Sequence, residues 1–295
     1  MIFPIAHENM EVRRLPVVTI SLIASMVLVH ILASPGAYEH FGDIPARGGV
    51  LTLVTYAFLH EGWFHLIGNA WFLFLAGAAL EDRWGRIAFS AFYLVTGVVA
   101  ALANRLIFPS SELAIIGASG AVAGAMGAFF VLFATTRVQF VLLWRKATVF
   151  SAPAYAMLLL WLGIEVVYAM LGAMLGAGGT AVAHWTHVGG FIFGAIVAAA
   201  FRALGLDHKL DDAAERAFFL GDDPRIEAAR ELLKRNQSAG ALAMLEGLAK
   251  EKPESFHVWE ALRDAAMAHG DEAKAERAAE KAAAIHRAAG RKRPQ

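Results

Sequence analysis

The chain contains no cysteine in its 295 residues, which excludes disulfide bonds and a thiol nucleophile. Its formal net charge is zero, so composition gives no argument for a nucleic-acid partner. Charged residues are rare in the first 205 positions, which hold only ten lysines and arginines and nine aspartates and glutamates. The sequence therefore predicts an apolar domain over residues 1–205 and a charged one over residues 206–295.

The predicted first domain contains several long apolar runs. A transmembrane helix needs about 20 mostly apolar residues. Six runs approach that length: 15–33, 63–80, 87–106, 115–135, 148–172 and 180–202. The predicted fold is all-α, with a six-helix transmembrane bundle followed by a small soluble helical domain.

Basic residues outside the apolar runs indicate the orientation, since lysine and arginine favour the cytoplasmic side. They gather before the first run and after the second, fourth and sixth: Arg13, Arg14, Arg83, Arg86, Arg137, Arg145, Lys146 and Arg202. Both termini should then be cytoplasmic, and the second, fourth and sixth runs should point inward. This pattern favours an integral protein of a bacterial inner membrane and is also compatible with an organelle membrane.

A few polar side chains lie inside the apolar runs, where such groups are costly and usually functional. They are His65, Asn69, Ser119, Glu165, His184 and His187. Residues 69, 119 and 187 should share a depth of about 6–11 Å on three helices of one direction, at about 1.5 Å per residue. A serine needs a base, which is usually histidine, and an oxyanion needs donors, which His65 and Asn69 could supply.

The base could be His187 or His184, which lie three residues apart. His187 precedes "VGGFIFG", whose Gly190 and Gly194 allow close approach to the glycines of "GASGAVAGAMG". This favours His187, although the glycine-rich run could by itself be only a packing motif. We expect a Ser–His dyad rather than a triad, because no carboxylate is predicted at this depth.

A zinc site is not predicted, and neither is a cofactor. The stretch "HEGWFH", from His60 to His65, has one residue too many for the zinc motif H-E-x-x-H. Histidines five residues apart point to different faces of a helix.

Three blocks together resemble the rhomboid intramembrane serine proteases: "FLHEGWFHLIGNAWFLFLAGAALEDRWG", "IGASGAVAGAMGAF" and "AHWTHVGGFIFG". The resemblance covers about residues 50–202. It implies that Ser119, in G-x-S-G, is the nucleophile and that His187, in H-x-G-G, is the base. It also implies that His65 and Asn69, in H-x-x-x-N, bind the oxyanion, and that a substrate transmembrane segment enters between the second and fifth spans.

The chain departs from the family pattern at three points. The Trp-Arg pair of some members is missing from the first loop, and Ala123 replaces a tyrosine that packs on the histidine in some members. Glu165 stands where many members have an uncharged residue. It could be an acid hydrogen-bonded inside the bundle, or it could gate substrate entry.

The charged C-terminal part resembles tetratricopeptide repeats, with two helix pairs joined at "LAKEKPES". It could bind a cytoplasmic protein, or it could be a helical bundle that packs on itself. The final "GRKRPQ" could touch anionic membrane lipid.

Two other functions are compatible with such a membrane protein. A catalytically inactive rhomboid-like protein would bind transmembrane segments without cutting them. A transporter would use Glu165 and the histidines as a proton path, but transporters typically show internal repeats, and none is visible here.

Overall fold

The computed structural model describes residues 2–8, 10, 12, 14–34, 36–143, 147–174, 178–211 and 223–291. The chain divides into two compact units, Met1–Ala214 and Glu215–Gln295. Asp207 and Asp211 pair with Arg83 at 3.2 and 2.9 Å, so the residues just after position 205 are part of the first unit. Arg13, Arg145, Lys146 and most of the basic C-terminal tail, on which predictions rested, lie outside the described residues.

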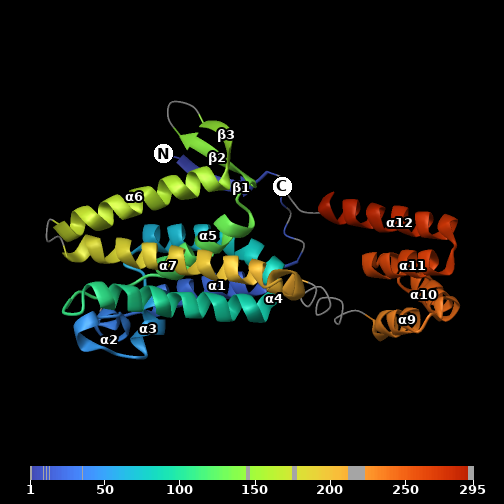
Figure 1. Cartoon of the computed structure of the whole chain (residues 1–295), viewed down its shortest axis with the longest axis horizontal. Coiled ribbons are helices and arrows are strands. Elements are labelled where there is room, and N and C mark those ends of the chain that lie inside the picture. The colour runs from blue at the N-terminus through green and yellow to red at the C-terminus, as the bar shows by residue number, and fades with distance from the viewer. Residues whose placement is uncertain are drawn as a thin grey trace. The chain divides into compact units, whose positions relative to one another are not determined.

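The first unit consists mainly of helices, as the sequence predicts (Figure 1). Its long helices are α1 (Val17–Leu32), α4 (Trp63–Ile107), α5 (Ser119–Leu132), α6 (Ala154–Met174) and α7 (Gly178–Ala203). The loop between α1 and α4 carries the short segments α2 (Ala37–Phe41), η1 (Pro45–Arg47), α3 (Thr52–Thr55) and η2 (Tyr56–Phe58).

Helix α4 corresponds to the second and third predicted spans. Its 45 residues are interrupted at Gly85, whose φ of 77° and ψ of 168° are not helical. A positive φ is readily adopted by glycine because it lacks a Cβ atom. The break divides α4 into two limbs, each long enough to approach the thickness of a bilayer.

The surface of the first unit is apolar, as a membrane protein requires. Three of its described helical stretches are long and apolar enough to cross a membrane, namely Trp63–Ile107, Ala154–Met174 and His184–Ala203. Helices α1 and α5 are apolar but shorter. Phe64 and Ile87 are 96% and 89% exposed, which is unfavourable in water and favourable against lipid. The count of six spans stays a prediction.

A three-stranded antiparallel sheet is the part of this unit that the sequence analysis did not predict. Its order is β1 (Ile2–His7), β2 (Arg137–Leu143) and β3 (Ala147–Pro153). The expected fifth span was therefore wrong at its start, because residues 148–153 are a strand and α6 begins at Ala154. An apolar run by itself does not distinguish a buried strand from the beginning of a helix.

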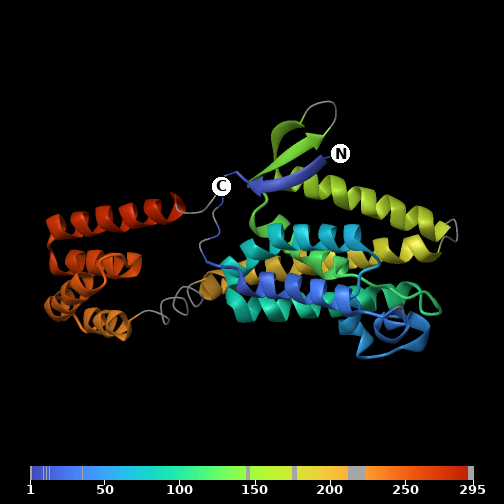
Figure 2. The same cartoon turned by 180° about the vertical axis from the view of Figure 1, so that it is seen from behind.

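Helix α5 lies inside the bundle, and all its residues from 120 to 129 are buried. It contacts α4 on one side and α7 on another, while α6 packs mainly on α7 and α1 on α4. Figures 1 and 2 show the sheet beside the N-terminal end of α6. The interior position of α5 places its N-terminus against side chains from both α4 and α7.

The C-terminal unit contains four described helices, in agreement with its predicted helical character. They are α9 (Pro224–Lys234), α10 (Ser238–Glu251), α11 (Phe256–His269) and α12 (Glu272–Arg291). Asp223 and Ser255 cap α9 and α11 by accepting backbone N–H groups. Leu245 and Leu248 lie in its own apolar core. The tetratricopeptide assignment stays a prediction.

Candidate functional site

Ser119 is the first residue of α5 rather than a residue inside the helix. The fourth run was expected to begin at residue 115, so the predicted start of this helix is wrong. Ile115 forms a bridge with Asp43, and Gly117 has a φ of 112°, so the chain enters the helix through a turn. The first backbone N–H groups of a helix have no partner within it, and the amide of Ser119 is one of these.

Small residues bring α5 and α7 into backbone contact, as their spacing predicts. A Cβ atom added at Gly190 would lie 2.1 Å from the carbonyl oxygen of Gly120. One turn further, a Cβ atom at Gly194 would lie 1.9 Å from the oxygen of Gly124. Only glycine fits such an approach. This contact fixes the distance between the helix that begins with Ser119 and the helix that carries His187.

One cavity of about 340 Å³ brings together all four site residues predicted from the sequence. Ser119 lies at the start of α5, His187 on α7, and His65 and Asn69 on α4; all four line this cavity. Among the described residues, no hydrogen bond joins Ser119 to His187. Such contacts often tighten only when a substrate binds.

His65 and Asn69 lie beside the turn that leads into Ser119. A Cβ atom at Gly117 would be 2.7 Å from two atoms of the His65 ring and 3.8 Å from Nδ2 of Asn69. The Asn69 amide also donates to the carbonyl oxygen of His65 at 3.1 Å. Glycine is required at position 117 for space as well as for its φ, and its absent side chain lets the two polar groups approach the nucleophile.

Glu165 on α6 also lines this cavity, which the sequence analysis did not foresee. Nδ1 of His187 lies 2.9 Å from its Oε2, within hydrogen-bond distance. The expectation that no carboxylate accompanies the histidine was therefore wrong. The predicted site was limited to the second, fourth and sixth apolar runs, which were expected to run in the same direction. Glu165 lies on α6, which corresponds to the fifth run and packs on α7.

Among the described residues, one cluster has side chains that could ligate a metal ion. It consists of Glu165, His184 and His187. Their ligand atoms all lie within 4.8 Å of one another. Nδ1 of His184 and Nδ1 of His187 lie 2.6 and 2.9 Å from one oxygen of Glu165. Two ligands of a tetrahedral zinc ion would be about 3.3 Å apart. These distances are those of hydrogen bonds.

His60 is a further residue of the site that sequence reasoning considered only as a zinc ligand. It is 1% exposed, and burial, together with the nearby His65, lowers the pKa of His60 to about 4. The neutral ring donates from Nδ1 to the oxygen of Phe58 at 3.3 Å and accepts the amide N–H of Ala118 at Nε2, at 3.5 Å. His60 thereby supports the residue that precedes the nucleophile.

Glu81 and Gly85 have structural roles on α4. The carboxylate of Glu81 accepts the backbone N–H groups of Val18 and Thr19 at 2.9 and 2.8 Å, and the Thr19 hydroxyl at 2.8 Å. A carboxylate satisfies the free donors at the N-terminus of α1 and interacts favourably with its dipole. Four residues later, Gly85 allows the chain to turn into the second limb of α4.

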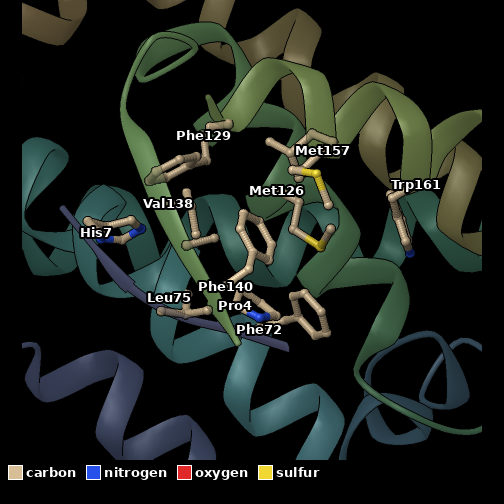
Figure 3. Close-up of a pocket in the computed structure, with 13 residues that line it drawn as sticks. Pro4, His7, Phe72, Leu75, Met126, Phe129, Val138, Phe140, Met157 and Trp161 are labelled. Atoms are coloured by element: carbon tan, nitrogen blue, oxygen red, sulfur yellow. The ribbon is translucent and has the colours of Figure 1, made fainter. Parts of the chain in front are cut away.

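A second, apolar cavity adjoins the first between α4 and α6. Figure 3 shows its lining, which includes Leu75 of α4, Met157 of α6 and Phe140 of β2. Its volume is about 240 Å³. Phe72, Met126 and Trp161 line both cavities, so the apolar space continues toward Ser119.

Comparison with known proteins agrees with this architecture. The Rhomboid domain family matches residues 47–204. The chain belongs to the rhomboid family. Together with its apolar helices, this membership makes it an integral membrane protein.

Rhomboid relatives occur in bacteria and plants. Putative rhomboid protease YdcA of Bacillus subtilis is 30% identical over 141 residues, which are 44% of this chain and 70% of the relative. Rhomboid protease GluP of the same species is 32% identical over 109 residues, 37% of this chain and 20% of GluP. Rhomboid-like protein 11, chloroplastic, of Arabidopsis thaliana is 41% identical over 71 residues, 24% of this chain. The matched stretch spans about a quarter of the Arabidopsis relatives' length.

Proposed function

We propose that this rhomboid protein is an intramembrane serine endopeptidase that cleaves transmembrane proteins in or near their membrane-spanning segments. The observation that carries the proposal is the single cavity lined by Ser119, His187, His65 and Asn69. A nucleophile, a base and two oxyanion donors are the parts that acyl transfer needs. The names of the bacterial relatives GluP and YdcA support the same reaction class.

The reaction follows from the roles of these groups. Ser119 Oγ attacks the peptide carbonyl carbon while Nε2 of His187 takes the hydroxyl proton. Asn69, His65 and the amide of Ser119 donate hydrogen bonds to the oxyanion. His187 then gives the proton to the leaving amine, and a water molecule, activated by the same ring, releases the acyl group from Ser119.

Substrate entry between α4 and α6 is supported by the apolar cavity at that position (Figure 3). Its lining suits the side chains of a transmembrane segment, and its shared residues lead toward Ser119. The substrate must unwind locally at the cut, because backbone hydrogen bonds shelter a helical peptide bond. Segments with glycine or proline near the cut should therefore be preferred.

Labelling with a fluorophosphonate probe tests the function without knowledge of the substrate. The detergent-solubilised full chain is compared with Ser119→Ala and His187→Ala. Labelling of the native protein alone is the expected result. No labelling of the folded native protein would favour an inactive binder of transmembrane segments, and labelling that survives Ser119→Ala would exclude this nucleophile.

The proposal also includes the membrane orientation of the protein and a partner for its C-terminal unit. The protein would lie in a bacterial inner membrane with cytoplasmic termini, and the C-terminal unit would bind a cytoplasmic protein. Cysteine scanning at the termini tests the orientation, since a membrane-impermeant thiol reagent added to intact cells should not label them. Affinity purification with the full chain, compared with a chain ending at residue 211, tests the partner.

A further inference from the structure

Two histidines of α7 converge on one carboxylate of α6. Nδ1 of His187 and Nδ1 of His184 lie 2.9 and 2.6 Å from the same Oε2 atom of Glu165. The Glu165 residue is 9% exposed. A buried carboxylate is stable only where hydrogen bonds compensate for lost hydration, and the two rings provide them.

When Glu165 is ionised, its contact with His187 determines which ring nitrogen carries the proton. An ionised carboxylate can only accept hydrogen bonds, so the ring must be protonated at Nδ1. Its Nε2 then has a free lone pair, which is the form that can take the serine proton. The opposite tautomer would carry its proton on Nε2 and could not act as the base.

Two neighbouring side chains, Ala123 and Trp161, do not select a tautomer of the ring. On α5, the side chain one turn after Ser119 is Ala123, whose methyl group cannot hydrogen-bond. The Trp161 ring lies 6.1 Å from the His187 ring, centroid to centroid, at an angle of 33°. This packing limits the tilt of the ring but does not distinguish its nitrogens.

His184 has a different position from His187. Its ring stacks on Tyr168 at 5.3 Å and 19°, and it is not among the residues that line the cavity with Ser119. It contributes a second hydrogen bond to Glu165, which keeps the carboxylate oriented between the two rings.

We propose that Glu165 is a positioning residue that completes a Ser119–His187–Glu165 triad, a role that rests on the proposed protease function. Through His187 it fixes the tautomer of the base, and its negative charge stabilises the imidazolium formed when Ser119 attacks. The serine proton moves to Nε2 and then to the leaving amine. The Nδ1 proton stays on the ring and Glu165 stays ionised throughout.

The test measures fluorophosphonate labelling rates of the full chain in detergent with EDTA, which removes any metal from the cluster. Glu165→Gln preserves size but removes the charge and should lower the rate about 100-fold or more. Glu165→Asp keeps a carboxylate and should recover part of the rate. The control is Glu112→Gln, since the Glu112 side chain is 71% exposed in a loop, and it should label like the native protein.

A second readout is independent of activity. Nitrogen-15 NMR of histidine-labelled protein, assigned with His187→Asn, should show His187 protonated at Nδ1 in the native protein and a mixture of tautomers in Glu165→Gln. Thermal unfolding confirms that the variants are folded.

The outcomes separate this inference from the proposed function. Native protein that labels through Ser119 and His187, with Glu165→Gln reacting at the native rate, would overturn the role of Glu165 and leave the protease intact. A native His187 protonated at Nε2 would also overturn it. Labelling that survives Ser119→Ala would instead refute the proposed nucleophile, while the tautomer measurement would still decide what Glu165 does.

Discussion

Replacing Gly190 with alanine tests whether the contact between α5 and α7 sets the geometry of the site. The added Cβ atom would lie 2.1 Å from the Gly120 oxygen, whereas Cβ atoms essentially never approach another heavy atom within 3.0 Å. The two backbones must separate locally by about 1 Å, because a packed interior has no free volume for the methyl group. Gly120 directly follows Ser119, and Gly190 lies three residues after His187, so the separation should move the nucleophile away from the base.

Two effects of Gly190→Ala are expected. Overpacking should lower the free energy of unfolding by about 1–3 kcal/mol, which thermal or denaturant unfolding in detergent measures. Misplacement of reacting groups by about 1 Å should lower the labelling rate about 100-fold. The labelling rate is the decisive quantity, because it depends on the position of Ser119 relative to His187. The free energy of unfolding would fall from overpacking alone.

The matched control is Gly163→Ala on α6. Nothing lies within 4 Å of a Cβ atom added there, so this variant should fold and label like the native protein, with a small gain in helix stability. The reasoning would be refuted if Gly190→Ala, shown to be folded, labelled at the native rate.

Three further predictions concern other contacts. Glu81→Gln should lower the free energy of unfolding by about 1–3 kcal/mol in thermal unfolding, because a charged acceptor of two N–H groups and a hydroxyl is lost; the exposed Glu112→Gln should not. Burial lowers the pKa of His60 to about 4 in the folded protein. Between about pH 6.5 and 4, the His60 ring is therefore protonated in the unfolded chain but neutral in the folded one. Stability should therefore fall as pH drops from about 6.5 to 4, and a His60→Asn variant should show a weaker fall. Leu245 is 1% exposed, so Leu245→Ala should destabilise the C-terminal unit by about 2–5 kcal/mol without changing the labelling rate. The control is Met267→Ala, at a 62% exposed position, which should change neither the stability nor the labelling rate.

Each of these predictions has a result that would contradict it. Equal unfolding of the two glutamate variants would show that the cap on α1 is not stabilising. An unchanged pH dependence in His60→Asn would assign the acid sensitivity to other groups. Slower labelling in Leu245→Ala would mean that the C-terminal unit affects the catalytic site.

Much of the site could be predicted from the sequence because its residues occur in local patterns. His65 and Asn69 are four residues apart on one helix, and the glycines after Ser119 and His187 mark helices that approach closely. Apolar length predicted the long helices of the first unit, although it misplaced the start of α6. The shift in charge after residue 205 predicted a second domain. These features depend on helix period and hydropathy, which neighbouring residues determine.

The role of Glu165 could not be predicted in the same way. It lies 22 residues before His187 along the chain, and only the packing of α6 on α7 places its carboxylate against the ring. The sheet shows the same limit, since β1 pairs with β2 across more than a hundred residues, and hydropathy does not encode such pairing. Likewise, the start of α5 at Ser119 depends on Gly117, His60 and the Asp43–Ile115 bridge meeting in space. The sequence by itself determined which helices form and which polar groups they carry. The tertiary structure alone decided which of those groups meet, because contacts between distant segments depend on how the helices pack.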